Sequence, residues 1–168
     1  TSTYIGFICK AADAGYKVFI LLTGTIESLR MQTQERVEEG FIGIDMSASK
    51  TGGLRVGVGE DKKPILAMAL TSRKRKGDFA GDSNKIAVAL SDKTAVVFVI
   101  KKQKDVLTKL RDWLVSLNAD PRTGKIDIPM LMIDDEADNA SINTNKSKED
   151  PTTINKLIRE LASIFTKS

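Results

Sequence analysis

The sequence contains no histidine and only one cysteine, Cys9, among its 168 residues. Without histidine the chain has no imidazole base or ligand, so it cannot build Ser-His or Cys-His catalytic machinery by itself. A single cysteine excludes an internal disulfide and a cysteine-rich zinc site. One unpaired thiol is typical of proteins in a reducing cytosol, and we therefore expect a cytoplasmic location.

Long apolar runs are also missing from the chain. No apolar stretch approaches the roughly 20 residues needed to cross a bilayer, so we expect no membrane partner. Apolar residues make up 41% of the sequence and charged residues 29%, which is ordinary for a globular domain. The net charge of +4 permits nucleic-acid binding but does not by itself indicate it.

Short apolar runs alternate along the chain with segments that are typical of helices. This alternation predicts one three-layer α/β domain, with a mainly parallel sheet between two layers of helices. The predicted strands cover residues 17–23, 63–72, 86–91, 95–102 and 129–134, and the predicted helices cover residues 4–14, 26–40, 103–118 and 150–165.

Several residues mark the expected ends of these helices. Gly15 and Gly40 are natural stops, and Thr25 is a possible N-cap of the second helix. Asp150 is placed to cap the last helix, with Pro151 at its first position. The stretch from about residue 43 to residue 95 is less regular, and we expect an insertion there.

The densest basic run, residues 73–76, falls within this insertion. An exposed basic loop can add sequence-independent affinity for nucleic-acid phosphates, with a strong dependence on salt. No aromatic residue interrupts the run, so base stacking is not expected. We favour the simpler interpretation, a solvated loop.

Four acids crowd the end of the last predicted strand, in the sequence PMLMIDDEADNAS. In parallel sheets ligands bind at the carboxyl ends of the strands. There one acid can hold Mg²⁺, which prefers oxygen ligands, and its neighbour can activate an attacking water. The alternatives are an exposed acidic turn and the metal site of a nuclease, although we find no convincing lysine partner for the second. The four acids are Asp134, Asp135, Glu136 and Asp138.

Residues 135–138, Asp-Glu-Ala-Asp, match the Walker B motif of superfamily II helicase-like ATPases. Three blocks in order, LLTGTIESLRMQTQERVEEGFIG, VVFVIKKQKDVLTKLRDWL and MLMIDDEADNASIN, resemble the ATPase region of bacterial Z-one-domain proteins. That family is named as endonucleases and is associated with restriction or phage-defence systems. The resemblance implies a RecA-like P-loop NTPase lobe, the first ATPase lobe of a DNA motor or translocase that uses ATP and Mg²⁺.

The resemblance also implies roles for the acids. Asp135 would bind the Mg²⁺ ion, Glu136 would be the catalytic acid, and Asp138 would couple the ATP site to neighbouring motifs. If the strand register is shifted by one residue, Asp134 and Asp135 take the first two roles instead.

Residues 25–32, TIESLRMQ, resemble motif Ia of the same superfamily, which contacts the nucleic-acid backbone. A helix N-terminus with nearby hydroxyl groups suits a phosphate, and two lysines end another strand on the same side of the sheet. An ordinary helix and solvated lysines would explain the same residues. The expected contacts with DNA are Thr25, Ser28, Arg30, Gln32, Lys101 and Lys102.

The phosphate-binding loop GxxxxGK[ST] does not occur in the 168 residues. We expect it immediately before the chain, with Thr1 as its last residue or just beyond it. The second RecA-like lobe and the Z-one domain would lie elsewhere in a longer protein, which would be a nucleoside triphosphatase. The 168-residue fragment is then expected to bind ATP poorly and to be inactive. A degenerate lobe that binds partners without hydrolysis is a further alternative.

Overall fold

The computed structural model describes residues 3–45, 47, 53–61, 66–79, 88–135 and 151–168. At its centre lies a four-stranded sheet in the order β4-β5-β1-β6, and all three strand pairings are parallel. The predicted α/β class with a parallel sheet is confirmed. The strands are β1 (Val18–Thr23), β4 (Ala67–Ala69), β5 (Ala95–Lys101) and β6 (Met130–Asp134).

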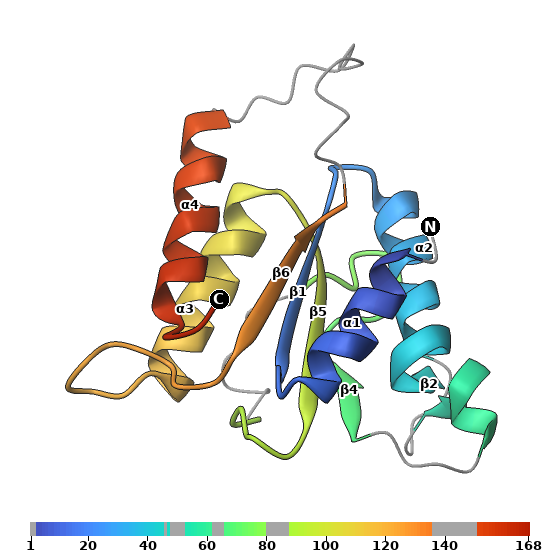
Figure 1. Cartoon of the computed structure of the whole chain (residues 1–168). Helices are drawn as coiled ribbons and strands as arrows, with labels where there is room; N and C mark the ends of the chain where they lie inside the picture. Colours follow the sequence, from blue (N-terminus) through green and yellow to red (C-terminus); the bar gives the residue numbers. More distant parts are fainter. Residues whose placement is uncertain (1–2, 46, 48–52, 62–65, 80–87, 136–150) are drawn as a thin grey trace.

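Helices cover both faces of this sheet (Figure 1). On one face lie α3 (Lys104–Asn118) and α4 (Pro151–Ile164), which pack against each other. The other face is covered by α1 (Thr3–Asp13), α2 (Glu27–Val37) and the short π-helix η1 (Glu38–Ile42). Within the described residues, no helix is long and apolar enough to cross a membrane.

The central strand β1 is buried on both faces because its side chains alternate between two cores. Ile20 and Leu22 join the core beneath α3 and α4, whereas Phe19 and Leu21 join the core beneath α1 and α2. This arrangement explains why the strand is a continuous apolar run rather than an alternating one.

The segment between α2 and β4 is irregular, as expected. It contains a small antiparallel pair, β2 (Ile44–Asp45) with β3 (Leu54–Arg55), and a 3₁₀ helix, η2 (Gly57–Asp61). Gly43 has a φ of 77°, and a Cβ atom there would lie 2.7 Å from the Cα atom of Gly59. Glycine is therefore required at position 43 by both conformation and space.

The predicted helix 26–40 differs from the structure at both ends. It begins at Glu27, and its N-cap residue is Ile26 without a side-chain hydrogen bond, so Thr25 is not the cap. At its other end the chain passes through Gly40 as a π-helix and stops at Gly43, whose amide donates to the Glu38 carbonyl. Burial of the π-helix side chains overrides the local stop signal.

Two predicted strands are also wrong in extent. Of the run 63–72, the described residues 66–72 form a strand only at Ala67–Ala69, and the first three residues lie outside the described ranges. Of the run 86–91, the described residues 88–91 form no strand, and the first two lie outside the described residues. Pro151 is the first residue of α4, as predicted, whereas the expected cap Asp150 lies outside the described residues.

Candidate functional site

The carboxyl ends of the central strands meet at one edge of the sheet. Thr23 at the end of β1 pairs with Lys101 at the end of β5, and Leu22 of β1 pairs with Asp134 at the end of β6. The predicted acids and lysines of different strands therefore converge on the same edge.

Asp134 lies next to a lysine that comes from the far side of β1. The Nζ atom of Lys102 is 2.8 Å from Oδ1 of Asp134, and both side chains are partly exposed. The amide of Lys102 also donates to the carbonyl oxygen of Thr23 at 3.0 Å, which fixes the lysine backbone over the end of β1. The positive charge of Lys102 thus compensates the charge of Asp134.

Asp135 has different surroundings from its neighbour. Its amide donates to the carbonyl oxygen of Leu22 at 3.0 Å, so its backbone remains attached to β1 beyond the end of β6. The hydroxyl of Thr33, from α2, donates to Oδ2 of Asp135 over a long 3.4 Å. The carboxylate is otherwise exposed to solvent. An exposed carboxylate on a fixed backbone suits Mg²⁺, which takes one or two carboxylates and keeps several waters.

A buried tyrosine lies beside Asp135. Among the described residues the hydroxyl of Tyr4, on α1, has no hydrogen-bond partner, although the residue is only 8% exposed. Burial raises the pKa of Tyr4, the charge of Asp135 raises it further, and Arg36 and Thr33 oppose this rise. Residues of α1, α2 and the end of β6 therefore meet around Asp135.

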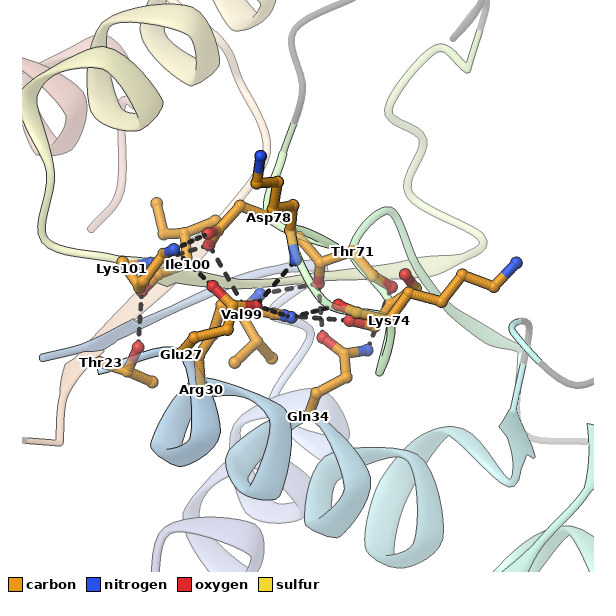
Figure 2. Close-up of polar contacts among 12 residues, drawn as sticks. Thr23, Glu27, Arg30, Gln34, Thr71, Lys74, Asp78, Val99, Ile100 and Lys101 are labelled. Atoms are coloured by element: carbon orange, nitrogen blue, oxygen red, sulfur yellow. Dashed lines mark hydrogen bonds and ion pairs between the residues drawn. The ribbon is translucent and has the colours of Figure 1, made fainter. Parts of the chain in front are cut away.

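Arg30 is turned inward rather than toward solvent (Figure 2). Its guanidinium is completely buried and donates to Glu27 Oε1 from Nε at 3.0 Å and from Nη2 at 2.8 Å. It also donates to the carbonyl oxygens of Ser72 and Lys74 at 3.0 and 2.8 Å. These bonds attach α2 to the loop after β4. The expectation that Arg30 contacts DNA does not fit this position, because its donors are used within the fold.

Lys101 is likewise part of this buried network. Its Nζ atom lies 2.9 Å from Oδ2 of Asp78 and also contacts Glu27 (Figure 2). Burial alone would raise the pKa of Glu27, but hydrogen bonds and charges from Lys101 and Arg30 lower it to about 2. Lys101 therefore holds the first turn of α2 against the end of β5, which leaves its ammonium poorly placed for the expected phosphate contact.

A second polar contact lies deeper beneath α2. Gln34 donates to Glu38 Oε1 at 2.7 Å and accepts a hydrogen bond from the Thr71 hydroxyl at 2.7 Å. Arg73 forms an ion pair with Glu38, which is completely buried. Burial raises the pKa of Glu38, and the hydrogen bonds from Gln34 and Arg73 offset only part of that rise.

The basic run 73–76 is thus divided. Arg73 forms ion pairs with Glu38 and Glu35. The side chains of Lys74, Arg75 and Lys76 are exposed. The expectation of a solvated loop applies to the last three residues and not to the first.

The remaining expected DNA contacts on α2 are exposed. Thr25 and Ser28 lie at its N-terminal end, and Gln32 lies one turn further along. Two apolar side chains accompany them, Ile26 at 57% exposed and Leu29 at 38%. This outer strip of α2 is separate from the buried polar face that contains Arg30.

Three predicted site residues, Thr1, Glu136 and Asp138, lie outside the described residues. Within the described ranges, no group of three or more acids or cysteines is gathered as a metal site. The sequence did not predict that Arg30 points inward or that Lys102 forms an ion pair with Asp134.

Comparison of the chain with protein-family models, with curated proteins and with solved structures finds no match.

Proposed function

We propose that the chain is the first ATPase lobe of a helicase-like DNA motor, in which Asp135 binds Mg²⁺ and Glu136 activates the attacking water. The observation that carries this proposal is the position of Asp135. It follows a strand of a parallel sheet directly, its carboxylate is exposed, and its amide is bonded to the Leu22 carbonyl oxygen. Such edges are where parallel α/β sheets bind ligands.

The contacts of Asp134 favour Asp135, rather than Asp134, as the Mg²⁺ ligand. Lys102 lies 2.8 Å from Asp134 and would compete with a cation for that carboxylate. A lysine beside a carboxylate also lowers its attraction for a second positive charge. Asp135, which contacts only the neutral hydroxyl of Thr33 among the side-chain hydrogen bonds described, is the better Mg²⁺ ligand.

The Mg²⁺ ion would supply charge stabilisation to the phosphate oxygens of the nucleotide. The chain would position that chemistry through the main-chain bond from Asp135 to Leu22 and the Thr33 contact. The second lobe and the phosphate-binding loop would come from a longer protein, as would the Z-one domain.

DNA would contact an exposed strip formed by Thr25, just before α2, and by Ser28 and Gln32 on α2. Hydroxyl and amide groups on a helix surface are suited to phosphate oxygens and carry no base specificity. Arg30 and Lys101 would act indirectly, because they hold the first turn of α2 in place through Glu27.

One observation favours a second candidate, a metal-dependent nuclease site. Lys102 beside Asp134 provides the combination of acid and lysine that such a site needs, which the sequence alone did not reveal. In that case Asp134 and Asp135 would hold the metal, and the ammonium would assist the attacking water or the scissile phosphate.

A Glu136→Gln change in the longer protein tests the first proposal against the second. Loss of ATP hydrolysis, with ATP still bound, supports an ATPase lobe. Unchanged hydrolysis would contradict it. If the change leaves hydrolysis intact while Lys102→Met abolishes DNA cleavage, the nuclease candidate replaces it.

A further inference from the structure

The hydroxyl of Tyr4 lies where α1, α2 and the end of β6 meet. The ring of Tyr4 belongs to the core beneath α1, and the residue is only 8% exposed. Burial raises the pKa of this hydroxyl most, and the nearby charges of Arg36 and Asp135 act on it in opposite directions. The packed ring therefore fixes a polar group beside the carboxylate of Asp135.

This hydroxyl is poorly used within the fold. Among the described residues, no group meets the geometry of a hydrogen bond to it. A buried polar group without a good partner costs free energy, and such groups in folded proteins call for a specific explanation. Phenylalanine would fill the same space in the core without that cost. The hydroxyl of Tyr4 is therefore better explained by a contact that forms at the adjacent site than by packing.

The surroundings of Tyr4 determine where its proton points. Arg36 lies close enough to lower the pKa of Tyr4, and a guanidinium can only donate hydrogen bonds. The Tyr4 oxygen is then the acceptor toward Arg36, and its own proton is left for another group. Asp135 is the anion whose charge acts on this hydroxyl, so its carboxylate is the natural acceptor.

Asp135 needs a further contact if it is to bind a cation in one orientation. The bond from its amide to Leu22 fixes the backbone, but not the carboxylate. The hydrogen bond from Thr33 to Oδ2 is long, at 3.4 Å, and holds the carboxylate weakly. Metal-binding carboxylates are normally oriented by hydrogen bonds to their other oxygen. Such bonds are often long or poorly aligned before a ligand is bound.

We propose that Tyr4 is a positioning residue for Asp135, and that its hydroxyl donates to the Asp135 carboxylate when a divalent cation binds there. Together with Thr33 it would hold one carboxylate oxygen and leave the other for the cation. The inference rests on the proposed cation-binding role of Asp135. It does not depend on the reaction that the cation serves.

Titration of the 168-residue chain with Mn²⁺ tests this inference, with paramagnetic broadening of the β6 amide signals as the measure of affinity. We expect Tyr4→Phe to weaken Mn²⁺ binding roughly 10-fold, as for the loss of an outer hydrogen bond to a metal ligand. The unfolding free energy should not fall, which separates positioning from folding. Tyr16→Phe is the control, because Tyr16 precedes β1 at the opposite end of the sheet.

A second comparison uses the Asp135→Asn background. Asp135→Asn alone should weaken Mn²⁺ binding at least as strongly as Tyr4→Phe. Addition of Tyr4→Phe should then change the affinity by less than about 2-fold, because the hydroxyl acts through that carboxylate.

Three results would overturn the inference. The first is equal Mn²⁺ affinity of Tyr4→Phe and the native chain while Asp135→Asn binds weakly, which leaves the proposed cation site intact. The second is an undiminished effect of Tyr4→Phe in the Asp135→Asn background. The third is unchanged Mn²⁺ affinity in Asp135→Asn itself, which would remove the cation site and the proposed function together.

Discussion

The ammonium group of Lys102 lies 2.8 Å from Asp134, while the adjacent Asp135 receives a hydrogen bond from Thr33. Two neighbouring acids at the end of one strand therefore have different electrostatic surroundings. The difference arises because Lys102 reaches across the end of β1 from the strand β5. The charge of Asp134 is thus compensated by Lys102, whereas Asp135 has no such ion pair within the described residues and could bind a cation.

Removal of the Lys102 charge is expected to strengthen cation binding at this edge. In Lys102→Met, both carboxylates could share one cation, and we expect Mn²⁺ to bind roughly 3- to 10-fold more tightly. Paramagnetic broadening of the amide signals of β6 measures this affinity. Lys109→Met removes an equal charge from the exposed surface of α3 and is the control. Weaker binding in Lys102→Met would mean that the lysine belongs to the site.

Loss of the Arg30 guanidinium is expected to destabilise the fold strongly. Arg30→Met leaves the carbonyl oxygens of Ser72 and Lys74 without this donor and leaves Glu27 with Lys101 as its remaining cationic partner, at a cost of about 3–5 kcal/mol. Arg30→Lys should recover little, because an ammonium cannot reproduce the forked contacts. Urea unfolding, followed by the fluorescence of Trp113, measures the change, and Trp113 is the single tryptophan of the chain.

Arg122→Met is the matched control for this experiment. The Arg122 side chain is 89% exposed and its contact with Asp120 is long, at 3.6 Å. We expect a change within about 0.5 kcal/mol. Equal effects of the two substitutions would contradict a structural role for Arg30.

Acid is expected to weaken the fold through Glu27. Its pKa is about 2 in the folded protein against an ordinary value of 4.5, so the folded state favours the ionised form. The resulting stability, up to about 3 kcal/mol, is present above pH 4.5 and is lost as the pH falls toward 2. The difference in unfolding free energy between the native chain and Glu27→Gln should shrink over this range. A constant difference would rule out the ion pairs as its source.

The buried hydroxyl of Tyr4 is expected to contribute no stability. Among the described residues no group meets the geometry of a hydrogen bond to it, although Arg36 and Thr33 lie close enough to lower its pKa, so Tyr4→Phe removes a poorly compensated polar group. We expect the unfolding free energy to stay constant or to rise by about 1 kcal/mol. Tyr16→Phe, at a tyrosine whose ring lies 5.3 Å from the Lys167 ammonium, is the control. A loss above 1 kcal/mol in Tyr4→Phe would show that the hydroxyl is bonded in solution.

The regular elements were predictable where apolar residues are spaced for one secondary structure. In the predicted helix 103–118, Leu107, Leu110 and Leu114 recur at helical spacing, and in α3 these residues are buried. The strands β1 and β5 were equally clear, because they are buried on both faces. In such segments burial of apolar side chains alone determines the structure.

The polar face of α2 could not be found in the same way. Arg30, Gln34 and Glu38 are completely buried, yet apolar periodicity assigns such residues to the solvent side. Their spacing of four residues, with Glu27 one turn before Arg30, was the available signal. Their partners come from the loop after β4, which is close only in the folded chain.

Of the four acids, Asp134 and Asp135 lie at the carboxyl end of β6, as the sequence predicted. Their separate surroundings were not predictable, because Lys102 precedes Asp134 by 32 positions and follows a strand two places away in the sheet. Tertiary contacts of this kind decide which of two adjacent acids keeps a free carboxylate for a cation.

The rate of ATP hydrolysis by the longer protein, measured for Asp135→Asn and Asp134→Asn side by side, tests the central claim most directly. We predict that Asp135→Asn lowers kcat by 100-fold or more, roughly the loss of a metal-linked electrostatic contribution, whereas Asp134→Asn changes it by less than about 10-fold. The reverse order would assign the metal to Asp134. Unchanged hydrolysis in both variants would contradict a nucleotide site at the end of β6.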